Sequence, residues 1–163
     1  MVKTPLRYDV RTFLIYIDSF ENGVPVGQYS NPCRDESGQF QSLTQLLLKL
    51  EQSLDVENIP QSFNKVRTFF PLTGYWLDMP VNERPRMGKM STFVVQILFR
   101  RNASWQGTIT WLDKNQTQNF RSVLELIVLI NSALEGMRFS QWQMTEDGYQ
   151  GLAREDGYQG LAR

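Results

Sequence analysis

Two stretches of the chain alternate apolar with polar residues at the period of a β-strand, in which successive side chains point to opposite faces. The first stretch starts at Thr12 and the second at Thr92. In both, aromatic and β-branched residues share one strand face: Phe13, Ile15, Ile17, Phe93, Val95, Ile97 and Phe99. A polar break follows each stretch, and the pattern predicts a second strand after it, over about 24–31 and about 105–112.

A helical pattern follows each pair of predicted strands. Ser42 with Gln45, and Ser122 with Glu125, match the capping box, in which the serine hydroxyl accepts an amide proton and the later side chain reaches back. Apolar residues then recur at helical spacing. They are Leu43, Leu46, Leu47, Leu50 and Leu54 in the first helix, and Val123, Leu126, Ile127, Ile130 and Leu134 in the second.

These matching patterns indicate an internal duplication. Residues 12–55 align without a gap on residues 92–135, and nine positions are identical where ordinary composition gives roughly three. The identical pairs are Thr12/Thr92, Phe13/Phe93, Ile17/Ile97, Asn22/Asn102, Gly27/Gly107, Phe40/Phe120, Ser42/Ser122, Leu46/Leu126 and Leu54/Leu134. The sequence therefore predicts an α+β fold of two tandem strand–strand–helix units, forming one antiparallel sheet with both helices on one face.

The domain organisation follows from the remaining segments. A length of 163 residues suits one domain, which we place at 1–145. The proline-rich middle, about 56–90, is predicted to be irregular chain that ends in a mobile loop at 82–89. Gly136 is a plausible helix cap, and 137–144 could add a short edge strand. Residues 146–163 repeat one nonapeptide twice in tandem, and we expect a tail that is flexible or foreign to the natural chain.

Part of the chain resembles a known protein family. The run Asn102-Ala-Ser-Trp-Gln-Gly-Thr-Ile-Thr-Trp-Leu112, with Phe120-Arg-Ser-Val-Leu-Glu-Leu126, Ser132-Ala-Leu134 and Gln45-Leu-Leu-Leu48, is similar to a family of small uncharacterised proteins from clostridia-type Firmicutes. The resemblance covers roughly 10–136 and leaves the tandem tail outside. It implies no particular activity, because the family has none assigned.

Composition excludes several kinds of chemistry. The chain contains no histidine and one cysteine, Cys33, which removes histidine-based triads, histidine-ligated metals and intrachain disulfides. Seventeen basic residues balance seventeen acidic ones, which argues against a net-basic nucleic-acid binder. No pair of carboxylates has a spacing that forces the two groups together. We therefore expect no catalytic residues, no metal and no cofactor.

The second predicted hairpin carries the strongest candidate binding residues. Arginine guanidinium groups beside indole rings suit stacked bases, or a peptide with aromatic and acidic groups. The residues are Arg100, Arg101, Trp105, Trp111 and Arg121. The competing interpretation is that Trp105 and Trp111 simply fill the core beside Ile109.

The second helix is apolar over more of its circumference than the first. Thr44 and Lys49 of the first helix correspond to Leu124 and Leu129 of the second. Such a broad apolar surface needs a cover, which the aromatic middle segment or a second copy of the chain could supply. We expect a homodimer with Leu124, Val128 and Leu129 at its interface.

These expectations define a leading function and two alternatives. The leading one is a non-enzymatic binding or scaffold module that self-associates, with a protein or peptide partner as a further possibility. The first alternative is a nucleic-acid or nucleotide binder that uses the hairpin residues above. The second is an enzyme with the 82–89 loop as a lid. No stretch is apolar enough to suggest a membrane span or a secretion signal, and we expect a cytoplasmic protein.

Overall fold

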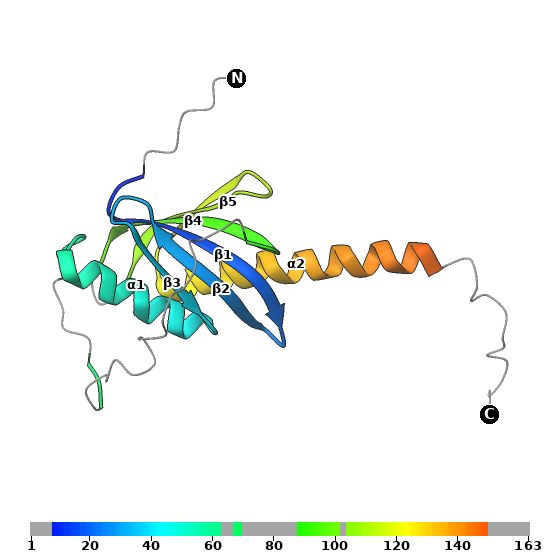
Figure 1. Cartoon of the computed structure of the whole chain (residues 1–163), viewed down its shortest axis with the longest axis horizontal. Helices are drawn as coiled ribbons and strands as arrows, with labels where there is room; N and C mark the ends of the chain where they lie inside the picture. Colours follow the sequence, from blue (N-terminus) through cyan, green and yellow to red (C-terminus); the bar gives the residue numbers. More distant parts are fainter. Residues whose placement is uncertain (1–7, 63–66, 70–87, 102–103, 150–163) are drawn as a thin grey trace, which may run out of the picture.

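The computed structural model describes residues 8–62, 67–69, 88–101 and 104–149, and for residues 139–149 it describes the backbone alone. The first unit contains β1 (Thr12–Glu21), β2 (Val24–Asn31), β3 (Glu36–Phe40) and α1 (Leu43–Glu57). The second contains β4 (Ser91–Phe99), β5 (Gln106–Trp111), β6 (Gln116–Phe120) and α2 (Val123–Tyr149). The strands form one six-stranded antiparallel sheet in the order β3-β2-β1-β4-β5-β6 (Figure 1).

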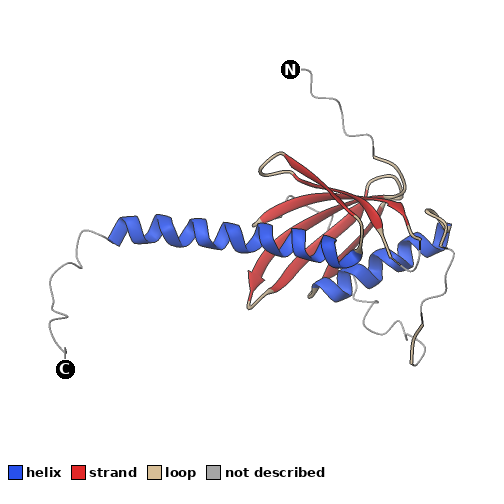
Figure 2. Cartoon of the chain, turned by 180° about the vertical axis from the view of Figure 1, so that it is seen from behind, coloured by secondary structure: helices blue, strands red, loops and turns tan. Residues whose placement is uncertain are grey.

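Both helices cross the same face of this sheet, so the predicted α+β architecture is confirmed (Figure 2). Each unit holds one more strand than the sequence pattern predicted, namely β3 and β6. These strands read Glu-Ser-Gly-Gln-Phe and Gln-Thr-Gln-Asn-Phe, and they lack the β-branched alternation that marks a strand. They form because short turns bring them back onto β2 and β5, with Asp35 and Asn115 at positive φ in those turns.

The strand registers show how closely the two units match. Ile17 pairs with Gly27 and Ile97 with Gly107, and each pairing shifts register at the next residues, Ile17/Ser19 and Ile97/Phe99. Between the units, Leu14 pairs with its own equivalent, Val94. The pseudo-twofold axis therefore passes between β1 and β4. The shift after Ile97 also corrects one expectation, because it leaves Phe99 exposed instead of on the core face.

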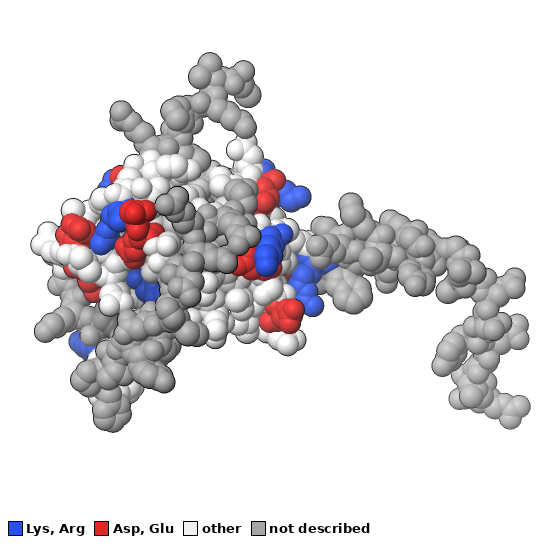
Figure 3. Space-filling model, viewed as in Figure 1, with Lys and Arg blue, Asp and Glu red and all other residues white. Residues whose placement is uncertain are grey.

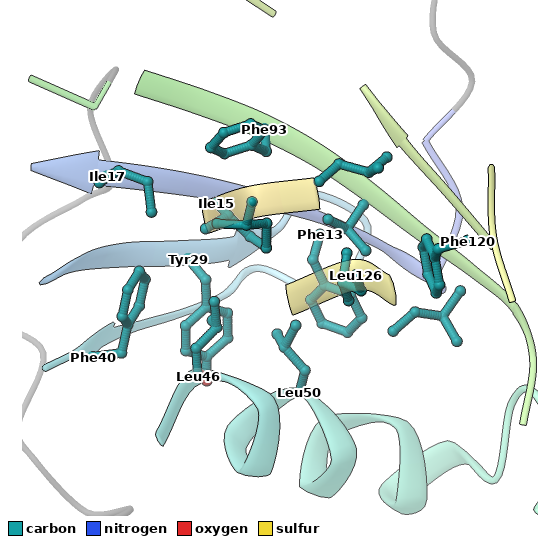
Figure 4. Close-up of a cluster of buried hydrophobic side chains, with 14 of the residues drawn as sticks. Phe13, Ile15, Ile17, Tyr29, Phe40, Leu46, Leu50, Phe93, Phe120 and Leu126 are labelled. Carbon is teal, nitrogen blue, oxygen red and sulfur yellow. The ribbon is translucent and has the colours of Figure 1, made fainter. Parts of the chain in front are cut away.

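The core lies between the sheet and the helices. Aromatic residues of equivalent strands are almost fully buried in both units: Phe13, Phe40, Phe93 and Phe120. Leu46 and Leu50 of α1 and Leu126 of α2 pack in the same cluster (Figure 4). The face predicted from alternation is therefore the face that the helices cover.

The second helix departs from the predicted boundaries. It continues through Gly136 to Tyr149 and extends beyond the sheet, so Gly136 is not a helix cap and 137–144 is not a strand (Figure 1). The predicted start of the tail at 146 falls inside this helix. The rest of the tandem repeat, 150–163, and most of the predicted loop, 82–87, lie outside the described residues.

Both predicted capping boxes are present. Ser42 Oγ accepts from the Gln45 amide at 3.2 Å, and Ser122 Oγ accepts from the Glu125 amide at 3.1 Å. The later side chains reach the residue before each serine: Gln45 Oε1 accepts from the amide of residue 41 at 2.7 Å, and Glu125 Oε2 from that of residue 121 at 2.6 Å. The two caps thus differ in charge but not in pattern.

This difference makes the second cap sensitive to acid. The Arg121 amide, followed by its guanidinium, holds the pKa of Glu125 below its ordinary value of 4.5. Since the folded pKa is the lower one, the stabilisation is present above about pH 4.5 and is lost as the pH falls through the folded pKa. We expect Glu125→Gln, which copies Gln45, to flatten the loss of unfolding free energy between pH 5 and pH 3. Parallel pH profiles for Glu125→Gln and wild type, from denaturant unfolding, would contradict this origin.

Candidate functional site

Arg100, the first predicted binding residue, is an interior residue. It follows β4 directly, and only 2% of its side chain is exposed. Its guanidinium donates to Asp55 Oδ1 at 2.6 Å and to the Pro60 carbonyl at 2.7 Å, and lies 3.3 Å from Glu51 Oε1. Both carboxylates belong to α1. Arg100 therefore joins the second unit to the first helix and is not placed to stack on a ligand.

Trp105 belongs to the same junction. The residue is 5% exposed, and its indole Nε1 donates to Glu51 Oε2 at 2.6 Å. The Glu51 carboxylate thus accepts a hydrogen bond from Trp105 and forms an ion pair with Arg100. The alternative interpretation, that Trp105 fills the core, is the one that the structure supports.

The side chains of the two remaining arginines contact other residues. The Arg101 guanidinium sits 5.7 Å from the ring centroid of Phe99. Arg121 precedes α2, its side chain is 87% exposed, and it pairs with Glu125 at 3.4 Å. The five predicted residues therefore do not converge on one surface. On the face that Figure 3 shows, basic and acidic side chains lie beside one another.

Trp111 lies in a different place, on the wall of a pocket between the sheet and α2. The pocket has a volume of about 250 Å³. Strands β4, β5 and β6 and one side of α2 supply its walls: Phe93, Ile109, Trp111, Gln116, Gln118, Leu129, Ser132 and Ala133. Two glutamine amides and one hydroxyl thus border an apolar floor.

The Trp111 ring is held in a fixed position at this pocket. Its Nε1 donates to Ser91 Oγ at 2.8 Å and to Asp113 Oδ2 at 3.2 Å. Asp113 Oδ2 also accepts from Ser91 Oγ and from the Thr92 amide, each at 2.8 Å. The ring centroid lies 6.1 Å from that of Phe93. Because this network orients the indole, the aromatic wall is formed before any ligand arrives.

The first unit supplies an internal comparison for this pocket. Position 109 corresponds to Tyr29 and position 118 to Gly38, and each pair faces across its hairpin. Tyr29 is 6% exposed, and its ring lies so close over Gly38 that a Cβ there would overlap it. In the first unit a buried tyrosine ring therefore stands where the second unit has the smaller Ile109, which lines the pocket.

Polar groups complete the filling in the first unit. Glu36 Oε2 accepts from Ser53 Oγ at 2.7 Å, and Arg34 Nη1 donates to the Ser53 carbonyl at 2.6 Å. Lys49 Nζ, which is buried, donates to the Gln39 carbonyl at 2.7 Å. Burial and the Glu36 carboxylate raise the pKa of Tyr29, which keeps its hydroxyl neutral.

The second unit carries an uncharged side chain at three of these positions and keeps a cation, Lys114, at the position of Arg34. Gln116 stands where the first unit has Glu36, Leu129 where it has Lys49, and Ala133 where it has Ser53. The pocket lining therefore contains no titratable side chain, and its hydroxyl, Ser132 Oγ, donates to the Leu129 carbonyl at 3.0 Å. Such a lining can bind an uncharged group through apolar contact and amide hydrogen bonds, but it offers no acid or base for catalysis.

The predicted interface residues divide into two kinds. Leu124 is 69% exposed and Val128 is 56% exposed, both on the solvent side of α2. Leu129 packs against the core and lines the pocket. The broad apolar surface that the sequence predicted for this helix therefore has two parts. Leu124 and Val128 form an exposed stripe, and Leu129 forms part of the pocket wall.

Sequence reasoning missed the pocket itself. Its signal was present in the alignment of the two units, at the exchanges of Tyr29 for Ile109 and of Lys49 for Leu129. The first exchange reduces side-chain volume and the second removes a positive charge, and both positions line the pocket in the second unit. This signal was not recognised because β6 was not predicted, and without β6 nothing placed Gln116 and Gln118 beside β5.

Comparison with known proteins adds no identification. No protein-family model, curated protein or solved structure matches the chain. The resemblance to uncharacterised proteins of Firmicutes therefore stays a prediction. Among the described residues, no group of histidine, cysteine, aspartate and glutamate is placed to hold a metal ion, and none of the helices is long and apolar enough to cross a membrane.

Proposed function

We propose that the chain is a non-enzymatic binding module, whose second unit holds one uncharged side chain of a protein or peptide partner. The observation that carries this proposal is the asymmetry between two matched units. The first unit fills the space under its helix with Tyr29, and the second leaves an aromatic-walled pocket of about 250 Å³ at the equivalent place. A cytoplasmic location, which the exposed free Cys33 suits, is part of the same proposal.

The size and lining of the pocket limit what it can bind. Its volume lies below the roughly 300–1,000 Å³ of pockets that enclose a whole drug-sized ligand. A single leucine or tyrosine side chain is of suitable size. Carboxylates and phosphates are poor ligands, since no cationic side chain lines the pocket to offset their desolvation.

Small amides are suitable probes for this proposal. We expect N-acetyl-tyrosinamide and N-acetyl-leucinamide to shift the NMR signals of the Trp111 indole N–H and the Ile109 methyls, with dissociation constants of order 1 mM. N-acetyl-glutamate should bind at least tenfold more weakly, because its carboxylate has no partner in the pocket.

The first unit provides the control variant. Ile109→Tyr with Gln118→Gly copies the Tyr29/Gly38 pair and should fill the pocket while the fold is retained. This closed variant should lose the amide binding and keep a cooperative unfolding transition. Binding that persists undiminished in the folded closed variant would place the probes elsewhere and reject the proposal.

The nucleic-acid alternative has less support. It depended on the five hairpin residues, and the side chains of two of them, Arg100 and Trp105, are buried at the junction with α1. Arg101 and Arg121 remain exposed, and they lie at the same end of the second unit, where β4 and β6 end. Two cations supply little of the phosphate neutralisation on which such binding depends.

Self-association is a second candidate function, which the exposure of Leu124 and Val128 favours. A stable interface buries about 800 Å² of accessible surface on each partner, and these two side chains supply only a small part of that area. If a symmetric homodimer forms through them, light scattering at micromolar concentration gives twice the chain mass of 19.0 kDa, and Leu124→Glu returns a folded monomer. A wild-type mass near 19.0 kDa rejects the homodimer.

Because Leu124 is exposed, Leu124→Glu should change the unfolding free energy by less than about 0.5 kcal/mol.

A further inference from the structure

The same chain carries, C-terminal to the pocket residues, a repeated sequence that contains tyrosine. α2 runs from the end of β6 back along the sheet. Its pocket residues, Leu129, Ser132 and Ala133, therefore lie beside the turn end of the β5–β6 hairpin, where β5 ends at Trp111 and β6 begins at Gln116. The helix then leaves the sheet and continues to Tyr149 (Figure 2). The tandem nonapeptide extends over 146–163, and each copy contains a tyrosine three positions after its glutamate.

We propose that Tyr158, in the second copy, occupies the pocket of its own chain and takes the place that Tyr29 holds in the first unit. This inference rests on the binding function proposed above and names the occupant. Tyr29 lies within 3.5 Å of Glu36 Oε1, and position 116, which corresponds to Glu36, carries a glutamine amide that can accept the same phenol proton. The second unit would thus regain a tyrosine that its strand lacks.

Chain length selects the second copy over the first. Sixteen helical residues separate Ala133 from Tyr149 and span about 24 Å. Nine further residues, from 149 to 158, reach back at most about 30 Å. Leu152 of the first copy is three residues past the helix and reaches only about 10 Å. Tyr158 is therefore the first aromatic residue after the helix that can return to the pocket.

Charge favours the same arrangement. Lys114, in the turn that joins β5 to β6, is exposed. Glu155 and Asp156 precede Tyr158 by three and two residues, so they would approach this lysine as the tyrosine enters the pocket. The one carboxylate of that turn, Asp113, is already engaged by Ser91, Thr92 and Trp111.

Two single variants of the full chain test the proposal, because the tandem repeat supplies its own control. Tyr158→Ser should shift the NMR signals of the Ile109 methyls and the Trp111 indole N–H, and Tyr149→Ser, in the same local sequence, should leave both in place. N-acetyl-tyrosinamide should bind Tyr158→Ser at least about fivefold more tightly than wild type, since the variant no longer fills its own pocket.

Three other outcomes overturn the proposal. Equal amide affinity in wild type and Tyr158→Ser would remove Tyr158 from the pocket and leave the binding function standing. No amide binding to either chain would remove the binding function as well. Ile109 shifts that depend on protein concentration in wild type would show that a second copy of the chain is the occupant.

Discussion

Replacing Gly107 by alanine should lower the free energy of unfolding by about 3 kcal/mol or more, which is the upper range for forced overpacking. Gly107 lies at the bulge of the β4–β5 pair, and a Cβ there would overlap the carbonyl oxygen of Gln96. Backbone cannot move aside without breaking the ladder. Gly27→Ala should cost a similar amount, because its Cβ would overlap the Tyr16 carbonyl in the equivalent place.

Gly136→Ala is the matched control for these two substitutions. Nothing lies within 4 Å of a Cβ at Gly136, which sits inside α2. There alanine should stabilise the protein by about 0.5–1 kcal/mol, since glycine is the poorer helix former. Chemical denaturation of the three variants measures the differences. A loss below about 1 kcal/mol for Gly107→Ala would mean that the two strands do not approach so closely.

Arg100→Ala should be the second strongly destabilising change, with a loss of about 2–4 kcal/mol. The substitution removes the donors of the Leu54 and Pro60 carbonyls and leaves a void against α1. Arg100→Met separates these effects, because it restores most of the volume but no donor. Glu51→Gln should cost less, since an amide can still accept from Trp105.

The same variants test what Arg100 does. If it is part of the junction between the units, folded Arg100→Met should bind N-acetyl-tyrosinamide as wild type does. A stability loss under about 0.5 kcal/mol for Arg100→Ala would contradict the junction, because surface substitutions have effects of that size.

Much of the fold was predictable because it repeats. The capping serines, the apolar helix stripes and the glycines at 27 and 107 each occur twice at one offset, so a pattern that is weak in one copy was strengthened by the other. β3 and β6 escaped prediction because hairpin geometry, and not their polar composition, places them in the sheet. The extension of α2 escaped because Gly136 is tolerated inside a helix at modest cost.

The candidate site was less predictable, for a physical reason. Arginine and tryptophan are as useful at an internal junction as at a ligand site, and only the buried contacts of Arg100 and Trp105 distinguish the two roles. Trp111 was among the predicted binding residues and lines the pocket, but the other residues that line it come from three strands and a helix. No spacing along the chain brings such residues together.

One measurement tests the central claim that the pocket of the second unit binds an uncharged side chain and that the equivalent place in the first unit, filled by Tyr29, does not. It is a titration of the methyl-labelled full chain with N-acetyl-tyrosinamide, recorded at Ile109 and Leu129 of the second unit and at Leu46 and Leu50 of the first. The methyl signals of Ile109 and Leu129 should shift along one saturable curve, while those of Leu46 and Leu50, packed with Tyr29 in the core, stay in place. Equal shifts in both units, or shifts in the first unit alone, would contradict the claim.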